Sequence, residues 1–181
     1  MKIATLTLSL VAVLFTASCG KDGSSTPAST PSSATANKPK IPDTFKLAAA
    51  PAAFITAGKA RAEAKTGDVV TVIGRVGGHS ENPFVPGLAS FTIVDPIMKP
   101  CGEDGMDGCK TPWDYCCADP DEMKKSTIVV EFRDDGNRPF LTTAKGFNGI
   151  EPLKTVYVTG KAEKDDGGNL VVVASGIFVR P

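Results

Sequence analysis

GDVVTVIGRV, residues 67–76, has the character of a β-strand that begins at a glycine. Apolar residues fill most positions up to Arg75, and Gly74 interrupts the run where a glycine often marks a bulge or a sharp bend. Four later stretches have the same strand character: ASFTIVD (89–95), STIVVEFRD (126–134), KTVYVTGKA (154–162) and NLVVVASGIFVR (169–180). Five short strands in one small domain predict a mainly all-β fold, a five-stranded closed barrel.

Two short helices accompany the predicted strands. The stretch PAAFITAGKARAEAK (51–65) is rich in good helix formers and places Phe54, Ala57 and Arg61 on one face. We expect it to form an N-terminal helix that packs against one end of the barrel. Residues 140–150 can hold a second short helix, between the third and fourth strands. The sequence EKDDGGN (163–169) predicts a hairpin turn between the last two strands.

Length, charge and motif content exclude several classes of function. The chain has 181 residues, which leaves room for one domain of about 110–130 residues beside its N-terminal segments. Its 20 basic and 20 acidic residues balance, and no basic cluster offers a phosphate-binding surface. The sequence contains no phosphate loop, HExxH or GxSxG motif, and its single histidine, His79, has no catalytic partners nearby in sequence. We therefore do not expect an enzyme.

The first 18 residues have the parts of an export signal: Lys2, an apolar run, and then small residues. They lead into Cys19-Gly20, which resembles the lipobox of bacterial lipoproteins, whose cysteine is lipidated. The resemblance implies lipidation at Cys19 and a location in the cell envelope, anchored to a membrane and facing the periplasm or the exterior. Ordinary signal cleavage and an incidental cysteine are the alternatives. Residues 19–45, rich in Ser, Thr, Pro and Ala, then form a flexible linker to a domain at 46–181.

The predicted strand order is that of an OB-fold. The segments GDVVTVIGRV, FTIVDP and VYVTGKAEKDDGGNLVVVASGIF resemble the first, second and last two strands of OB-fold domains of the anticodon-binding type. That resemblance implies a ligand lying across the second and third strands, on a surface that would use His79, Phe84, Phe91, Thr92, Phe132 and Arg133. The 163–169 loop is acidic, which opposes the nucleic-acid ligands usual in that family. A glycan, a peptide or another envelope component is the ligand we expect.

The order of segments also resembles secreted lipoproteins of the planctomycete group. The features that carry this resemblance are the lipobox-like cysteine, the tether, and the motifs NPFVPGLASFTIVDP and CxxxxxxxCxTPWDYCC. It implies a cellular address and supplies no mechanism.

Four of the five cysteines lie in an insertion between the second and third predicted strands, residues 96–125. Paired cysteines in exported proteins usually form disulfides. Three pairings are open, and the adjacent Cys116 and Cys117 bond most readily outward, to Cys101 and Cys109, because a ring between neighbours is strained. The alternatives are a zinc or copper site made by the same four thiolates, and thiol-redox chemistry.

Trp113 and Tyr115 are the aromatic residues of this insertion. Beside a barrel groove they could stack on a base or a sugar ring. The alternative is that they cover the disulfides as a small local core.

Overall fold

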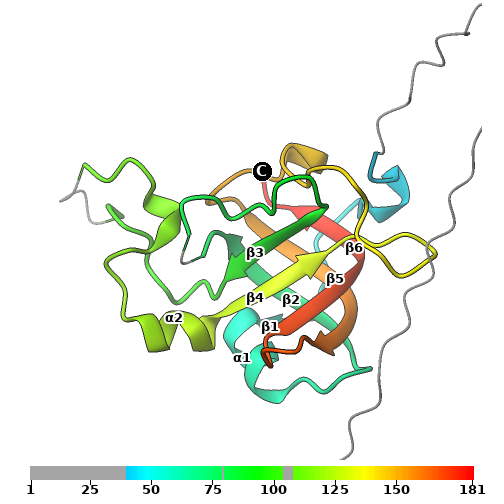
Figure 1. Cartoon of the computed structure of the whole chain (residues 1–181), viewed down its shortest axis with the longest axis horizontal. Coiled ribbons are helices and arrows are strands. Elements are labelled where there is room, and N and C mark those ends of the chain that lie inside the picture. Colours follow the sequence, from blue (N-terminus) through cyan, green and yellow to red (C-terminus); the bar gives the residue numbers. More distant parts are fainter. Residues whose placement is uncertain (1–39, 79, 104–107) are drawn as a thin grey trace, which may run out of the picture. The chain divides into compact units, whose positions relative to one another are not determined.

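The computed structural model describes residues 40–78, 80–103 and 108–181 (Figure 1). Its strands are β1 (Ile55–Thr56), β2 (Val69–Val76), β3 (Ser90–Val94), β4 (Thr127–Glu131), β5 (Thr155–Lys164) and β6 (Leu170–Val179). Its helices are α1 (Ala57–Glu63) and α2 (Pro120–Ser126), with 3-10 turns η1 (Asp43–Phe45), η2 (Pro112–Asp114) and η3 (Phe147–Gly149). Within the described residues, no helix has the length and apolar character needed to cross a membrane.

Five strands form a closed barrel, which confirms the predicted architecture. They are hydrogen-bonded in the order β2-β3-β4-β6-β5, and β5 pairs back onto β2. The β4–β6 pair is parallel, while the β2–β3, β3–β4, β5–β6 and β2–β5 pairs are antiparallel. This order and these directions are compatible with an OB-fold-like barrel.

Two glycines occupy places where a side chain would not fit. Strand β2 pairs with β1 up to Ile73 and with β3 from Arg75 onward. Between them, a Cβ on Gly74 would stand 2.8 Å from the Ile93 side chain. On β5, the register with β6 shifts at Gly160, where a Cβ would clash with a backbone carbonyl of β6. The bulge bends the long β5–β6 hairpin and increases its twist.

The N-terminal helix is shorter than the predicted one. It begins at Ala57 because Thr56 caps it, with the threonine hydroxyl accepting the Lys59 N–H at 3.3 Å. Ala57 and Ala60 are fully buried, and α1 contacts α2, β2 and β4 at one end of the barrel. The packing role is therefore confirmed. Phe54 lies before the helix and is 46% exposed.

The barrel interior is filled by aromatic and β-branched side chains. Phe132 is at the centre of the aromatic group, with its ring centroid 5.2 Å from that of Phe45, 5.4 Å from that of Phe147 and 6.2 Å from that of Phe91. Phe147 belongs to η3, the only helical turn in the region where a second helix was predicted. The insertion does lie between β3 and β4, and it contains η2 and α2.

Candidate functional site

A shallow groove crosses the outer face of β3 and β4. It has a volume of about 320 Å³, and α2 and the turn between β5 and β6 border it. The side chains used in the argument below are Arg61, Thr92, Met123, Lys124, Val129 and Asn169.

Strand alternation decides which side chains enter this groove. Thr92 of β3 and Val129 of β4 are register partners, and both are half-buried. The next pair along, Phe91 and Val130, is fully buried in the core. Successive strand residues face opposite sides of a sheet, so Thr92 and Val129 point outward.

The rim of the groove is fixed by Arg61 of α1. Its Nη1 donates to the Thr127 carbonyl at 3.1 Å, and its Nη2 donates to the Asn169 amide oxygen at 3.0 Å. These contacts connect α1 to β4 and to the β5–β6 turn. A cation and an amide are thereby held at the edge of a largely apolar floor.

The sequence-predicted ligand residues are distributed differently from expectation. Phe91 and Phe132 are fully buried in the core and offer no ring face to an external ligand. Phe84 also belongs to the core, but it is 5% exposed and lines a hollow beside Trp113. Arg133 is near the surface but is engaged by Glu131 and Glu163, each with an N–O distance of 2.8 Å. His79 lies outside the described residues, as does Cys19.

The two aromatics of the insertion have separate surroundings. Trp113 is half-buried, and its Nε1 donates to the Glu81 carbonyl at 2.8 Å, beside a second hollow of about 370 Å³. Tyr115 is fully buried and packs with Val94 and Met123. That burial raises the pKa of the Tyr115 hydroxyl. Tyr115 therefore belongs to a small local core, which was the alternative to a ligand-stacking role in the sequence analysis.

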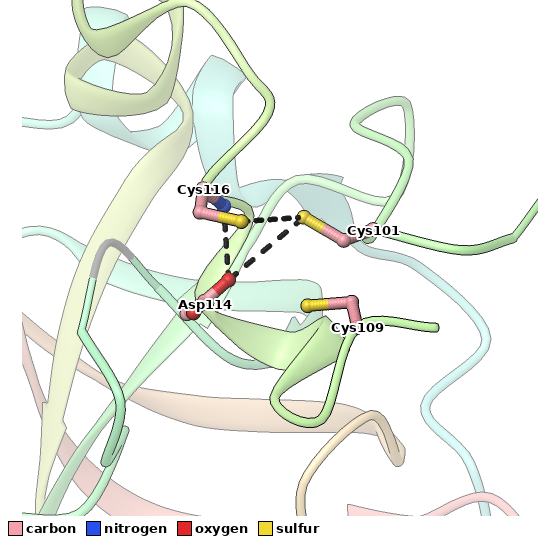
Figure 2. Close-up of side chains that lie close together, drawn as sticks. All are labelled: Cys101, Cys109, Asp114 and Cys116. Atoms are coloured by element: carbon pink, nitrogen blue, oxygen red, sulfur yellow. Dashed lines mark hydrogen bonds between the residues drawn. The ribbon is translucent and has the colours of Figure 1, made fainter. Parts of the chain in front are cut away.

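The cysteine segment brings three sulfurs and one carboxylate together (Figure 2). One ligand atom from each of Cys101, Cys109, Asp114 and Cys116 lies within 4.8 Å of all the others. The Cys101 Sγ is 3.4 Å from the Cys116 Sγ and 3.8 Å from Asp114 Oδ1. We call these four residues the Cys–Asp cluster. Asp114 was not singled out from the sequence as a ligand.

Local backbone geometry builds the Cys–Asp cluster. The turn η2 ends at Asp114, and the next residue, Tyr115, adopts a left-handed conformation with φ 52°. This reversal lets Asp114 Oδ1 accept the Cys116 N–H at 2.9 Å. Cys101 is placed beside them because its N–H donates to the Pro112 carbonyl at 3.1 Å.

Hydrogen bonds shift the pKa values of the cluster in opposite directions. Burial raises the pKa of Cys101, but hydrogen bonds from the Cys117 backbone and from the Cys116 and Cys117 thiols outweigh it, so the net shift is downward. The Cys116 pKa is raised, first by its hydrogen bond to Cys101. Burial opposes ionisation of Asp114, yet its bonds from the Cys116 N–H and the Thr111 hydroxyl keep its pKa below the ordinary value. Cys101 is therefore the more acidic thiol of the pair and Cys116 the less acidic one.

None of the cysteines in the described part of the chain lies at disulfide distance from another. No disulfide joins Cys101, Cys109, Cys116 or Cys117 to another of these four residues. The Sγ atoms of Cys116 and Cys117 are 3.8 Å apart, and a disulfide requires about 2.05 Å. The predicted disulfide-stapled insertion stays a prediction.

Comparisons with known proteins identify no family for this chain. No protein-family model matches the chain, and no curated protein matches it. What the structure establishes is a closed five-stranded barrel, compatible with an OB-fold, that carries a groove on its outer face and the Cys–Asp cluster in its insertion.

Proposed function

We propose that the protein is an exported, lipid-anchored binding module of the bacterial cell envelope. One observation supports the binding role most strongly. The groove lies across the second and third barrel strands and reaches the turn between the last two, which is the face that OB-fold barrels use for oligonucleotides and oligosaccharides.

The chemistry of the groove favours a small segment of a glycan or peptide. Its floor includes the half-buried Val129, which suits the apolar face of a sugar or a short aliphatic side chain, and the buried Met123 lies beneath it. Arg61 and Lys124 supply positive charge at the rim, where the Asn169 amide holds the Arg61 guanidinium in place. A ligand with carboxylate groups beside sugars and small side chains fits this combination, as in soluble fragments of peptidoglycan.

Nucleic acid fits less well. The chain has no net charge, and Arg133 is already paired with Glu131 and Glu163. Counterion release from a phosphate backbone requires several uncommitted cations along one surface.

A titration followed by amide NMR shifts tests the binding proposal. Soluble peptidoglycan fragments added to the full chain in detergent should shift the amides of β3, β4 and the β5–β6 turn. Val129→Lys should abolish those shifts because the lysine fills the groove. The matched control is Val69→Lys, at a β2 position that is 80% exposed and outside the groove. Shifts that are absent, or unaffected by Val129→Lys, would contradict the proposal, and a salt-sensitive response to single-stranded DNA would replace it with nucleic-acid binding.

Membrane attachment through Cys19 is tested separately. Because Ala17-Ser18-Cys19-Gly20 resembles a lipobox, Cys19→Ala should move the protein from the membrane fraction to the soluble fraction. Cys117→Ser, which changes a cysteine outside the signal segment, is the control and should remain with the membrane. An unchanged distribution of Cys19→Ala would reject lipid anchoring.

The Cys–Asp cluster supports a second function, in which the insertion binds a metal or exchanges thiols. The observation in its favour is the convergence of three sulfurs and a carboxylate. It concerns a different part of the surface from the groove and does not depend on a groove ligand.

A further inference from the structure

We propose that Cys101, Cys109, Asp114 and Cys116 bind one zinc ion as a closed, tetrahedral structural site. The site uses Asp114 as its fourth ligand and leaves Cys117 out of the coordination sphere. Zinc binding would displace the remaining thiol protons to solvent, leaving three thiolates and one carboxylate around the ion.

Distances within the Cys–Asp cluster match a tetrahedral zinc site more closely than a disulfide. With Zn–S bonds of about 2.3 Å, the sulfurs of a tetrahedral site stand about 3.8 Å apart. A carboxylate oxygen at about 2.0 Å from zinc then stands about 3.5 Å from each sulfur. Cys101 Sγ lies 3.4 Å from Cys116 Sγ and 3.8 Å from Asp114 Oδ1, so these two distances differ from the tetrahedral values by a few tenths of an ångström. Every other pair of ligand atoms, including those with Cys109, lies within 4.8 Å, so closing the site needs movements of about 1 Å at most.

Asp114 is oriented as metal-binding carboxylates usually are. Its Oδ2 accepts the Thr111 hydroxyl at 2.8 Å, and its Oδ1 accepts the Cys116 N–H at 2.9 Å. Such bonds from outside the coordination sphere fix the direction of a ligand before the ion arrives. The second lone pair of Oδ1 remains to face the sulfurs, toward which the carboxylate points in Figure 2.

The donor set favours zinc over the other ions that soft sites take. Three thiolates exclude calcium and magnesium, which require oxygen ligands. A carboxylate ligand is a poor partner for Cu(I), which prefers sulfur alone, whereas Zn²⁺ accepts sulfur and oxygen together in a tetrahedral shell. Because all four positions are filled by protein atoms, none is left for a reacting water. We therefore assign the site a structural role.

A zinc ion here would brace the wall of the groove. Cys116 follows Tyr115, whose buried ring packs against Met123 of α2. Met123 in turn lines the groove. Fixing both sides of Tyr115 through Asp114 and Cys116 thus holds α2 against β3, in a part of the chain that has few regular backbone pairings of its own.

Cys117 provides the matched control. Its sulfur is 3.8 Å from that of Cys116, yet it is not among the four residues whose ligand atoms all approach one another. Adjacent residues also reach one tetrahedral ion only with strain. Under the zinc proposal Cys117→Ser should keep the metal, whereas in a two-disulfide arrangement the same change would release a partner thiol.

The test is metal stoichiometry on the full chain, purified without chelators and under anaerobic conditions. We expect one zinc per chain, and substitution by Co²⁺ should give the intense visible bands of a tetrahedral thiolate complex. Cys109→Ser and Asp114→Asn should lose the metal. Thr111→Val should weaken zinc binding by about 10–100-fold, with Thr111→Ser restoring it, because only the hydroxyl that orients Asp114 has changed. Cys117→Ser should bind as the wild type does.

Three results would overturn the zinc site. The first is a chain that takes up no zinc even after reduction and reconstitution. The second is equal zinc binding by all the variants, which would mean surface-bound metal only. The third is intact mass with two disulfides in the isolated protein, together with a free thiol created by Cys117→Ser, which would establish the disulfide-stapled insertion instead. Each can be read without a groove ligand, so failure of the binding proposal would not mimic any of them.

Discussion

The OB-fold resemblance placed Phe132 on the ligand-binding surface, whereas the structure places it in the core. The substitution Phe132→Leu distinguishes these two roles. The ring is fully buried and has edge-on neighbours in Phe45 and Phe147. Phe132→Leu should therefore lower the free energy of unfolding and leave groove binding unchanged, since nothing of this side chain reaches the outer face.

The size of the effect follows from these contacts. Truncation of a buried phenylalanine to alanine costs about 3–5 kcal/mol. Leucine keeps much of the volume but loses two edge-to-face pairs, each worth about 0.5–1.5 kcal/mol. We expect Phe132→Leu to lower the free energy of unfolding by about 1.5–3 kcal/mol, a large part of the about 5–15 kcal/mol that holds a typical domain folded.

Urea unfolding followed by far-UV circular dichroism measures the change. With a slope of about 1–3 kcal/mol per molar urea, the midpoint should fall by about 1 M. Phe54→Leu makes the same chemical change on a ring that is 46% exposed and contacts Tyr157, and should lower the midpoint much less. Equal midpoints for the two variants, or a loss of ligand binding by Phe132→Leu at unchanged stability, would refute the assignment of Phe132 to the core.

Two further predictions concern the β5–β6 hairpin. Gly160→Ala should lower the free energy of unfolding by about 1–3 kcal/mol in the same urea assay, because the added Cβ meets the Val173 carbonyl. The control is Gly108→Ala, where an added Cβ has no neighbour within 4 Å, and its free energy of unfolding should stay within about 0.5 kcal/mol of the wild type. Hydrogen bonds from the Asn169 side chain and backbone lower the pKa of Asp165. The ionised carboxylate therefore stabilises the fold above the unfolded-state pKa of about 3.9, and this contribution disappears as the pH falls through the folded-state pKa. Asn169→Ala should raise the folded-state pKa of Asp165 in an NMR titration, and an unchanged pKa would contradict the assigned cause.

The strands were predictable because each carries its own local signal. Runs rich in apolar and β-branched residues defined all five barrel strands, and β2 begins two residues after the predicted glycine start at Gly67. The helix α2 also had a readable signal that went unused: Asp119 at the N-cap, Pro120 in the first turn, and lysines in the last turn. With only seven residues, the helix is too short to show an apolar period of its own.

The ligand surface was less predictable, because the resemblance indicates which strands contact a ligand but does not indicate which residues of those strands face outward from the barrel. The side follows from alternation: in SFTIV, Phe91 and Ile93 are fully buried, so Thr92 between them faces out. Of the transferred residues that the structure describes, only Thr92 lines the groove on β3 and β4. Asn169 and Arg61 had no local signal, since their positions depend on contacts more than 60 residues apart in sequence.

Convergence of the Cys–Asp cluster could not be derived from spacing. The approach of the Cys101 and Cys116 sulfurs depends on the backbone reversal at Tyr115. Tyr115 is a non-glycine residue in a left-handed conformation, and the sequence TPWDYCC does not predict that conformation. The threonine three residues before Asp114 is the one local hint, because its hydroxyl bonds to that carboxylate.

Closure of the barrel between β2 and β5 has a consequence for how the chain folds. The β5–β6 hairpin pairs residues that are close in sequence, but the β2–β5 seam joins residues such as Thr71 and Thr159, 88 positions apart. Contacts of such long range form slowly, because the entropy of closing the loop is lost before the pairing is gained. The first strand must therefore wait with one edge unpaired until nearly the whole domain has emerged. If the chain is exported, that interval of exposure falls on the far side of the membrane, where folding factors of the envelope would meet it.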